Sequence, residues 1–418
     1  MIMRTVPVLA LSAALGAGAV GAAMTMRPAP PPAAADDWDR RPGPDSGRVA
    51  ILLDALGRTD PIVCEMIADQ IGNFWTDGER ATVGRFAALP AAHRAAKDSI
   101  GGHVIDPRAI DRLVAELSTT NACVRRVAAK LLGNSTVAPT RLRALLGDAS
   151  ATVRESAAYA AGVGERPELR GALETMLRDQ EPAVGAMAAW ALGETEDRAS
   201  LPALVAAMRG SQPRIRLAAI WALGQIEDSR AVPEVIPALR DADPTIRAMA
   251  ADVLGDIEDD RAIAPLEGAL ASDADVRVRT AAAESLGELA ASASAGALGR
   301  ALSDADIAVR RAAAAALGDL DDLETAPPAL VAALRSGDAE LRHHAANALA
   351  EIADPATTPA LVELLSDSSA EIRKNAAEAL GEIGTPEAVR GLTRALEDKD
   401  PEVRRSAVEA LAEAKDDN

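Results

Sequence analysis

The chain contains 418 residues, of which only 2% are aromatic, and its net charge is −19. A single globular core of this length normally contains more Phe, Tyr and Trp, because each of these side chains buries a large apolar area. The charge argues against nucleic acid as the partner, since phosphate binding requires clustered Lys and Arg. It is compatible with a basic or apolar partner.

The first residues have the composition of a targeting segment. Arg4 precedes an uninterrupted run of apolar and small residues from Val6 to Ala23. We interpret residues 1–27 as a signal peptide or, because the run is nearly long enough to cross a bilayer, as an N-terminal membrane anchor. Residues 28–45 are rich in Pro and Ala and are predicted to form a disordered linker. The segment predicts export to the periplasm or secretion, with membrane contact only through an uncleaved anchor.

From residue 46 onward the sequence predicts helical hairpins, and those in residues 46–134 are degenerate. Residues 73–105 fit no periodic pattern and are interpreted as an insertion. An insertion in a repeat protein often lies at a binding face, and a terminal cap is an equally good interpretation. Cys64 and Cys123 each lie at the start of a predicted second helix. They could form a disulfide in an exported protein or remain two buried thiols, and the sequence leaves both open.

The regular part of the chain covers residues 135–415 and is followed by a tail at 416–418. It repeats one phrase: an apolar residue, Arg, two variable residues, Ala-Ala, two variable residues and Leu-Gly. The leading apolar residues of the clearest copies, 29 to 32 residues apart, are Val124, Val153, Val184, Ile215, Ile246, Val278, Val309, Leu341, Ile372 and Val403. The phrase predicts an all-α fold, a right-handed α-solenoid of about eleven helical hairpins with a period of about 31 residues.

One copy shows how the phrase encodes a hairpin. Asp243 is a candidate N-cap of the second helix, and Pro244 is a favourable first residue. Ile246 and Leu254 lie on one face of this helix, and Gly255 is predicted to end it. A single hairpin cannot bury such a face, so stability must come from stacking on neighbouring hairpins.

The repeated helix, preceded by an Asp-x-Asp-Pro-like turn, resembles the HEAT repeats of the phycobilisome-lyase type over roughly residues 46–415. The resemblance implies a solenoid whose second helices line the concave face, and it implies a binding scaffold. The name of the subtype also suggests a phycobilin-lyase-like enzyme, which the predicted export disfavours.

An Arg follows the leading apolar residue in nine hairpins. These residues are Arg125, Arg154, Arg216, Arg247, Arg279, Arg310, Arg342, Arg373 and Arg404, whereas Cys64 and Gly185 stand at the same position in two others. The row could bind anions. Each Arg, however, follows a turn Asp by a few residues, as at Asp148, Asp243, Asp275, Asp306 and Asp400. We interpret the row as a structural ladder, in which each guanidinium binds the carboxylate or carbonyls of a neighbouring turn.

Three aromatic residues share one position in consecutive hairpins. Tyr159, Trp190 and Trp221 are each the sixth residue after the leading apolar residue. Since packed helices lie about 8–10 Å apart, we expect a short row of rings on or near the concave face. Met187 and Met249 would widen this apolar surface. The row is a candidate partner-binding site, and the alternative is that each ring folds down between helices.

Beyond Trp221 the same face becomes acidic. Asp252, Asp256, Glu284 and Glu288 are the further candidate partner-binding residues. They belong to a predicted acidic band that also includes Glu194, Asp319, Glu351, Glu378, Glu382, Glu409 and Glu413. The band is interpreted either as a solvated surface or as a docking surface for a basic segment.

The sequence lacks motifs for chemistry. None of its four His lies in a zinc-binding pattern, and no Gly-rich phosphate loop occurs. We therefore predict no catalytic residue, no cofactor and no metal. The leading hypothesis is a non-enzymatic scaffold that binds a protein or peptide along the concave face. The alternatives are a HEAT-family enzyme that handles a cofactor, and a sensor arm anchored in the membrane.

Overall fold

The computed structural model describes residues 45–58, 103–320 and 322–416, with side chains up to residue 412. These residues belong to one compact unit, Pro42–Asn418. The predicted targeting segment and nearly all of the predicted linker and insertion lie outside the described residues. Among the helices that are described, none is both long enough and apolar enough to cross a membrane.

The described residues form helical hairpins, as predicted. The unit begins with α1 (Ser46–Gly57). The first helices of the following hairpins are α4 (Pro107–Glu116), α6 (Pro139–Leu146), α8 (Arg170–Met176), α10 (Leu201–Met208), α12 (Val232–Val235), α14 (Ile263–Ser272), α16 (Ala295–Ala301), α18 (Pro328–Ala333), α20 (Thr358–Leu364) and α22 (Pro386–Ala395). Short 3₁₀ turns lie beside several of them, at Pro167–Leu169, Arg198–Ser200, Ser229–Ala231, Ile236–Arg240, Asp260–Ala262, Ser292–Ser294 and Pro355–Thr357.

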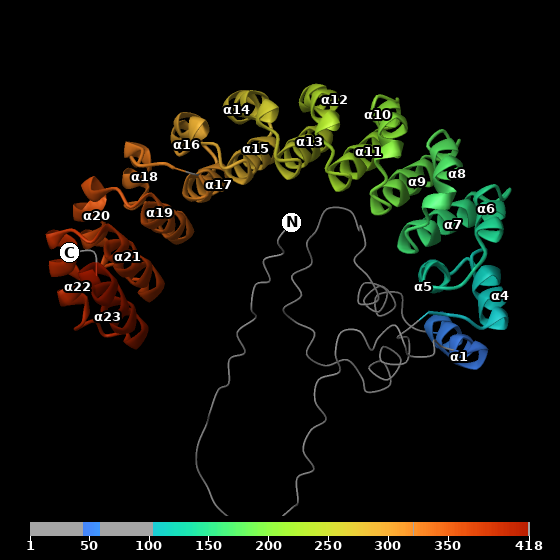
Figure 1. Ribbon diagram of the computed structural model, residues 1–418, viewed down its shortest axis with the longest axis horizontal. Coiled ribbons are helices and arrows are strands. Elements are labelled where there is room, and N and C mark those ends of the chain that lie inside the picture. Colours follow the sequence, from blue (N-terminus) through green and yellow to red (C-terminus); the bar gives the residue numbers. More distant parts are fainter. Residues whose placement is uncertain (1–44, 59–102, 321, 417–418) are drawn as a thin grey trace, which may run out of the picture. The chain divides into compact units, whose positions relative to one another are not determined.

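The second helices contain the repeated phrase. They are α5 (Ala122–Gly133), α7 (Ala151–Val163), α9 (Pro182–Glu194), α11 (Pro213–Gln225), α13 (Pro244–Asp256), α15 (Val276–Glu288), α17 (Ile307–Gly318), α19 (Ala339–Ile352), α21 (Ala370–Ile383) and α23 (Pro401–Asp416). Each packs on the second helix of the next hairpin, more extensively than the first helices pack on one another. Within the unit, the second helices lie on the inner side of the curved array and the first helices on the outer side (Figure 1). We call the layer of second helices the inner face.

The starts of the second helices follow from their turn residues. Asp243 accepts a hydrogen bond from the backbone N–H of Thr245 at 2.9 Å, and Pro244 is the first helical residue. This confirms the predicted N-cap. Asp106, Asp275, Asp306 and Asp338 cap other helices in the same way. Gly255, in contrast, does not end its helix, since α13 continues to Asp256.

The Gly of the phrase is needed because successive second helices approach closely. A Cβ atom added to Gly287 in α15 would lie 2.9 Å from both Cα and Cβ of Ala316 in α17. A Cβ atom on Gly193 in α9 would lie 2.9 Å from Cα of Ala222 in α11. Real Cβ atoms do not approach other atoms this closely. The Gly therefore permits a contact between helices, which is the correction to its predicted role as a helix terminator.

A matched pair of substitutions tests this packing constraint. Gly287→Ala should lower the free energy of unfolding by about 1–3 kcal/mol, because the added methyl group overpacks the contact between α15 and α17. Gly268→Ala in α14, where the added Cβ has no neighbour within 4 Å, should raise it by about 0.5–1 kcal/mol through helix propensity. Urea unfolding measures both. Equal stability of the two variants would contradict the constraint.

Candidate functional site

The Arg side chains of the phrase join each hairpin to the next one. In six hairpins both Nε and Nη2 donate to one Asp carboxylate, at 2.7 to 3.2 Å. The pairs are Arg154–Asp179, Arg216–Asp241, Arg247–Asp273, Arg279–Asp304, Arg342–Asp367 and Arg373–Asp398. We call these pairs the Arg–Asp ladder. Each Asp lies in the turn of the following hairpin, so the bonds cross the interface between repeats.

Where both neighbouring hairpins carry the Arg, the turn between them is held from both sides. Arg247 Nη1 donates to the carbonyl of Asp241 in its own hairpin at 2.9 Å, while the carboxylate of Asp241 accepts from Arg216 of the preceding hairpin. The structural interpretation of the Arg row is therefore correct, since each ladder guanidinium binds a carboxylate of a neighbouring turn. Asp243 and Asp275, which also lie in these turns, cap helices. The sequence pattern could not distinguish two Asp residues that lie two positions apart in one turn.

The ladder is interrupted at two positions inside the array. Gly185 stands where an Arg is expected, and Gly210 stands where its Asp would lie in the next turn. The space is filled by Ile215, because a Cβ on Gly185 would lie 2.6 Å from Ile215 Cδ1. At Arg310 the next turn offers Ser336 instead of Asp. At these two interruptions the ladder carboxylate is therefore replaced by a neutral residue. Arg125 makes a different contact, since its Nη1 donates to the carbonyl of Thr119 at 2.7 Å.

The aromatic row is partly a core feature. Tyr159 is only 5% exposed, and its ring lies 5.3 Å from that of Trp190, measured between centroids, at an interplanar angle of 42°. Burial raises the pKa of the Tyr159 hydroxyl. The structure therefore favours the alternative interpretation for Tyr159, in which the ring folds down between helices. Removed from the surface, this ring cannot anchor a partner directly.

The two Trp rings are half-buried and lie over glycines of the preceding hairpin. A Cβ on Gly162 would lie 2.5 Å from Trp190 Cζ3, and one on Gly193 would lie 2.9 Å from Trp221 Cζ3. Met187 and Met249 are also half-buried against the core. The two Trp rings of the row thus remain only partly accessible.

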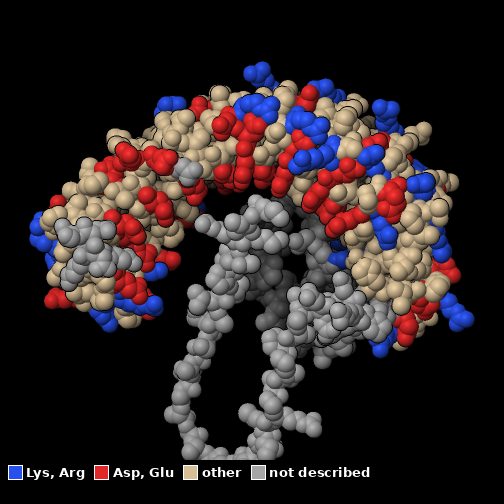
Figure 2. All heavy atoms as spheres, in the orientation of Figure 1, with Lys and Arg blue, Asp and Glu red and all other residues tan. Residues whose placement is uncertain are grey.

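The candidate acidic residues are exposed, and two of them come together. Asp256 and Glu288 line a hollow of about 350 Å³ at the C-terminal ends of α11, α13 and α15, together with Gln225, Glu227 and Glu258. Figure 2 shows acidic side chains gathered along the inner edge of the array in this region. Asp252 and Glu284 are exposed on the same helices, without lining the hollow. We call this cavity, with the carboxylates of Glu227, Asp256, Glu258 and Glu288, the acidic hollow.

Electrostatics distinguish the acidic hollow from the ladder. Although its side chain is exposed, partial desolvation in the hollow, followed by the charges of Asp256 and Glu284, raises the pKa of Glu288. Burial and the charge of Glu227 raise the pKa of Asp256. The hydrogen bond from Arg247, in contrast, lowers the pKa of Asp273 in the ladder. Raised pKa values of carboxyl groups in a concave site are typical of functional positions, since stability alone would favour a neighbouring cation.

Sequence reasoning missed two members of the hollow. Glu227 and Glu258 adopt positive φ angles of 47° and 53°, in the turn after each second helix. The left-handed conformation disfavours a side chain such as Glu. A Glu recurs there in four successive hairpins, at Glu165, Glu196, Glu227 and Glu258. Their regular spacing in the sequence is the signal that could have found them, although it lies outside the repeated phrase.

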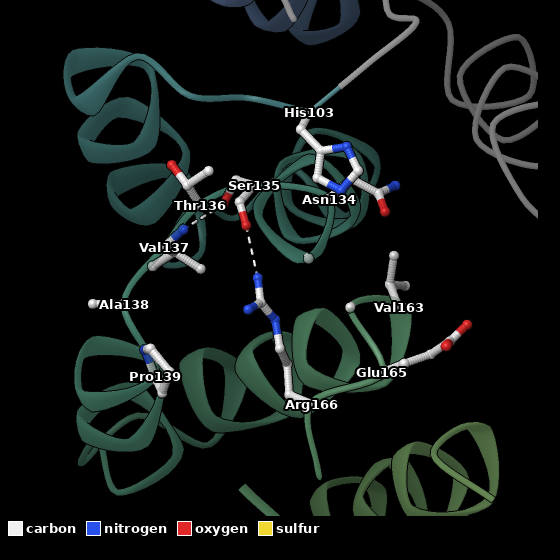
Figure 3. Close-up of a pocket in the computed structure, with 12 residues that line it drawn as sticks. His103, Asn134, Ser135, Thr136, Val137, Ala138, Pro139, Val163, Glu165 and Arg166 are labelled. Atoms are coloured by element: carbon white, nitrogen blue, oxygen red, sulfur yellow. Dashed lines mark hydrogen bonds between the residues drawn. The ribbon is translucent and has the colours of Figure 1, made fainter. Parts of the chain in front are cut away.

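A second hollow, of about 620 Å³, lies between the turn after α5 and the turn after α7 (Figure 3). His103, Asn134 and Glu165 line it, and Arg166 points across it to donate from Nη2 to the carbonyl of Ser135 at 2.7 Å. Its one guanidinium is thus used to connect two hairpins. The mixed charges and the bonded Arg166 favour a structural role for this hollow.

The described residues contain no group of three or more His, Cys, Asp and Glu placed to hold a metal ion. His343 is hydrogen-bonded to the side chains of Asn347 and Asn375, at 3.3 and 2.6 Å. Cys123 is disulfide-bonded. The sequence holds one other cysteine, Cys64, which lies outside the described residues.

Comparisons with known proteins agree with this architecture. A family model described as HEAT repeats matches residues 138–216, 202–287, 269–340 and 327–412. No curated protein sequence matches the chain. A chain from the solved structure of Kap95p with RanGDP is 17% identical, with a TM-score of 0.50, over 74% of this chain and 48% of that one. This similarity shows the fold alone.

Two further solved structures align less closely. An engineered protein is 23% identical over 73% of this chain and 98% of its own, with a TM-score of 0.44. Human deoxyhypusine hydroxylase in complex with glycerol is 23% identical over 60% of this chain and 96% of its own, with a TM-score of 0.28. Neither superposes well enough to support a functional argument.

The Arg–Asp ladder predicts a large effect of removing one partner. Arg247→Ala should lower the free energy of unfolding by about 3 kcal/mol, because Asp273 would remain as a nearly buried charge without its cation. The side chains of Arg247 and Asp273 are 15% and 10% exposed. As a control, Arg405→Ala removes a pair whose Arg is 69% exposed and should change stability by less than about 1 kcal/mol. A small effect of Arg247→Ala would show that the ladder is not stabilising.

The ladder also predicts loss of stability in acid. The partner Arg lowers the carboxyl pKa of Asp179, Asp273, Asp304 and Asp398. Because the folded-state pKa lies below the unfolded value of about 3.9, this stabilisation is complete above about pH 4 and is lost as the pH falls further. Urea unfolding between neutral pH and about pH 2.5 should show this decrease, and Asp273→Asn should make it shallower. An unchanged pH profile in that variant would contradict the assignment.

Proposed function

The chain belongs to the HEAT-repeat family, and from this premise we propose that it is a non-enzymatic scaffold that binds a protein or peptide along the inner face of its solenoid. The observation that carries the proposal is the acidic hollow. Its carboxyl groups include two whose pKa values are raised by burial and by like charges. Ionisation of these two carboxyl groups is therefore less favourable than in water, and a bound cationic side chain would offset this cost.

The proposed partner is a basic segment that runs along the inner face. Carboxylates of the hollow come from three successive hairpins, represented by Glu227, Asp256 and Glu288. Neighbouring helices lie about 8–10 Å apart, and three residues of an extended chain span about 10 Å. An extended peptide with Lys or Arg at every third position would therefore match the spacing. The half-buried rings of Trp190 in α9 and Trp221 in α11 offer an apolar contact on neighbouring second helices.

The finer family assignment and the location of the protein are also part of the proposal. We retain the resemblance to the phycobilisome-lyase type of HEAT repeat on the basis of the repeated phrase, without inferring lyase activity from it. We propose export because the apolar run from Val6 to Ala23 has the composition of a signal or anchor. The disulfide at Cys123 supports the same proposal, because disulfides persist mainly in oxidising compartments outside the cytoplasm.

Two other functions remain distinguishable by simple measurements. A cofactor-handling enzyme would be purified with a bound chromophore or metal, which absorption spectra and elemental analysis detect. A membrane-anchored sensor arm would retain its first residues, so N-terminal sequencing of the mature protein separates it from a secreted scaffold. No observation on the described residues favours either function over the scaffold.

A synthetic peptide tests the proposed partner chemistry. The probe is a fluorescent twelve-residue peptide with Lys at every third position and Ser or Thr between them. The double variant Asp256→Asn, Glu288→Gln should bind it at least about tenfold more weakly than the unchanged protein, because two central carboxylates are lost. Added salt should weaken binding to the unchanged protein as well. Fluorescence anisotropy measures both effects.

The control separates the hollow from the net charge of the chain. Glu387→Gln with Glu397→Gln also removes two exposed carboxylates, but in the last hairpin and outside the second helices. This control should bind the peptide as the unchanged protein does. Equal weakening in both double variants would show that attraction is non-specific, and unchanged binding in the first would remove the hollow as the site.

A further inference from the structure

Three consecutive second helices carry apolar residues at a position that is polar elsewhere. Position two, counted from the leading apolar residue, is Ala186 in α9, Leu217 in α11 and Ala248 in α13. In the other second helices that the structure describes, this position is Arg126, Glu155, Thr280, Arg311, His343, Lys374 or Arg405. The stacking of hairpins therefore does not require an apolar residue at position two.

Neighbouring side chains extend this apolar surface across the three helices. Trp190 and Trp221 lie at position six of α9 and α11, and Met249 lies at position three of α13. We call the following half-buried residues the apolar strip: Ala186, Trp190, Leu217, Trp221, Ala248 and Met249. Because α9, α11 and α13 pack on one another in the inner layer (Figure 1), the strip runs along the inner face of the array.

Carboxylates follow the apolar strip at the C-terminal ends of the same helices. We call them the acidic edge, which shares three members with the acidic hollow and consists of Glu194, Glu196, Glu227, Asp256 and Glu258. Position ten lies about 6 Å beyond position six along a helix. Burial and the charges of Glu165 and Glu196 raise the pKa of Glu194, whereas a hydrogen bond from the Trp190 side chain opposes this shift. The strip and the edge are thus in contact at α9 and follow the same direction along the array.

Two adjacent surfaces of different chemistry constrain the conformation of a ligand that crosses successive helices. Neighbouring helices lie about 8–10 Å apart. A polyproline II helix has three residues per turn and rises about 9.3 Å per turn, so every third residue points to the same side. In a β-strand, residues three apart point to opposite faces. An α-helix returns to one side at this spacing after about seven residues. A polyproline II segment therefore contacts both surfaces at each helix with the fewest residues.

We propose that the inner face binds a polyproline II segment that places a Pro on the apolar strip and a Lys or Arg on the acidic edge in every triplet of residues. This inference rests on the proposed function, because the acidic edge includes carboxylates of the acidic hollow. It adds the conformation and the apolar side of the ligand. Pro-rich segments bind aromatic-lined grooves because their conformation is preformed and little entropy is lost. Trp190 and Trp221, on neighbouring helices, supply two such aromatic contacts.

Three fluorescent peptides of twelve residues test the proposal. The first repeats Lys-Pro-Ser, the second repeats Lys-Ser-Ser with the same charge, and the third has the composition of the first in an irregular order. Fluorescence anisotropy should show that the first peptide binds at least about tenfold more tightly than the other two, because it alone matches both surfaces at every helix. Equal binding of the first peptide and either of the others overturns the proposal.

Substitutions in the apolar strip locate the Pro contact. Leu217→Asn and, separately, Trp221→Ala should weaken binding of the Lys-Pro-Ser peptide to the level of the Lys-Ser-Ser peptide, whose own binding should not change. Circular dichroism verifies the fold, and Leu217→Asn decides the test if Trp221→Ala unfolds the chain. Ala315→Asn is the matched control, since Ala315 is half-buried at position six of α17, outside the strip. It should leave the binding of both peptides unchanged.

The possible outcomes separate this inference from the proposed function. Strip variants that weaken both peptides equally, or that weaken neither, overturn the polyproline II proposal. The acidic hollow stands in that case if Asp256→Asn with Glu288→Gln still weakens binding of the Lys-Ser-Ser peptide. Absence of binding by all three peptides overturns both proposals.

Discussion

The close approach of successive second helices determines most other features of this solenoid. Gly in one helix faces a small residue of the next, as at Gly287 and Ala316. This contact brings the helices together along their lengths, so Ala can fill a core that contains few aromatic side chains. The same close approach also determines how deeply larger side chains are buried. The rings of Trp190 and Trp221 lie over the glycines of the preceding hairpins and are consequently half-buried.

The Arg–Asp ladder orients each hairpin relative to the next one, and its ion pairs add no net charge. Each guanidinium binds a carboxylate of the next turn and carbonyls of its own turn, which fixes the rotation of one hairpin relative to its neighbour. The ladder pairs are electrically neutral. The net charge of −19 must therefore be carried by other carboxylates, and those of the acidic hollow contribute to it. The ladder is thus neutral, whereas the inner face at α11, α13 and α15 carries an excess of carboxylates.

The fold could be predicted from the sequence because its period, its Asp-Pro helix starts and its small residues all indicate stacked hairpins. The details that could not be predicted from the sequence depend on contacts between repeats. Asp243 and Asp241 are both turn acids in one copy, and only the position of the preceding hairpin decides which one Arg216 reaches. Tyr159 shares its repeat position with two Trp residues, yet its ring is more deeply buried. Glu227 and Glu258 were missed because the turn brings them to the hollow, although they lie outside the repeated phrase.

The central claim is that the inner face at α11, α13 and α15 binds a basic segment. Hydrogen exchange measured with and without the Lys-containing peptide tests it most directly, because it locates the contact without any substitution. We predict slower exchange at the C-terminal ends of these three helices and in the turns that contain Glu227 and Glu258, with first helices such as α14 unchanged. Protection confined to the first helices, or equal protection along the whole array, would contradict the claim.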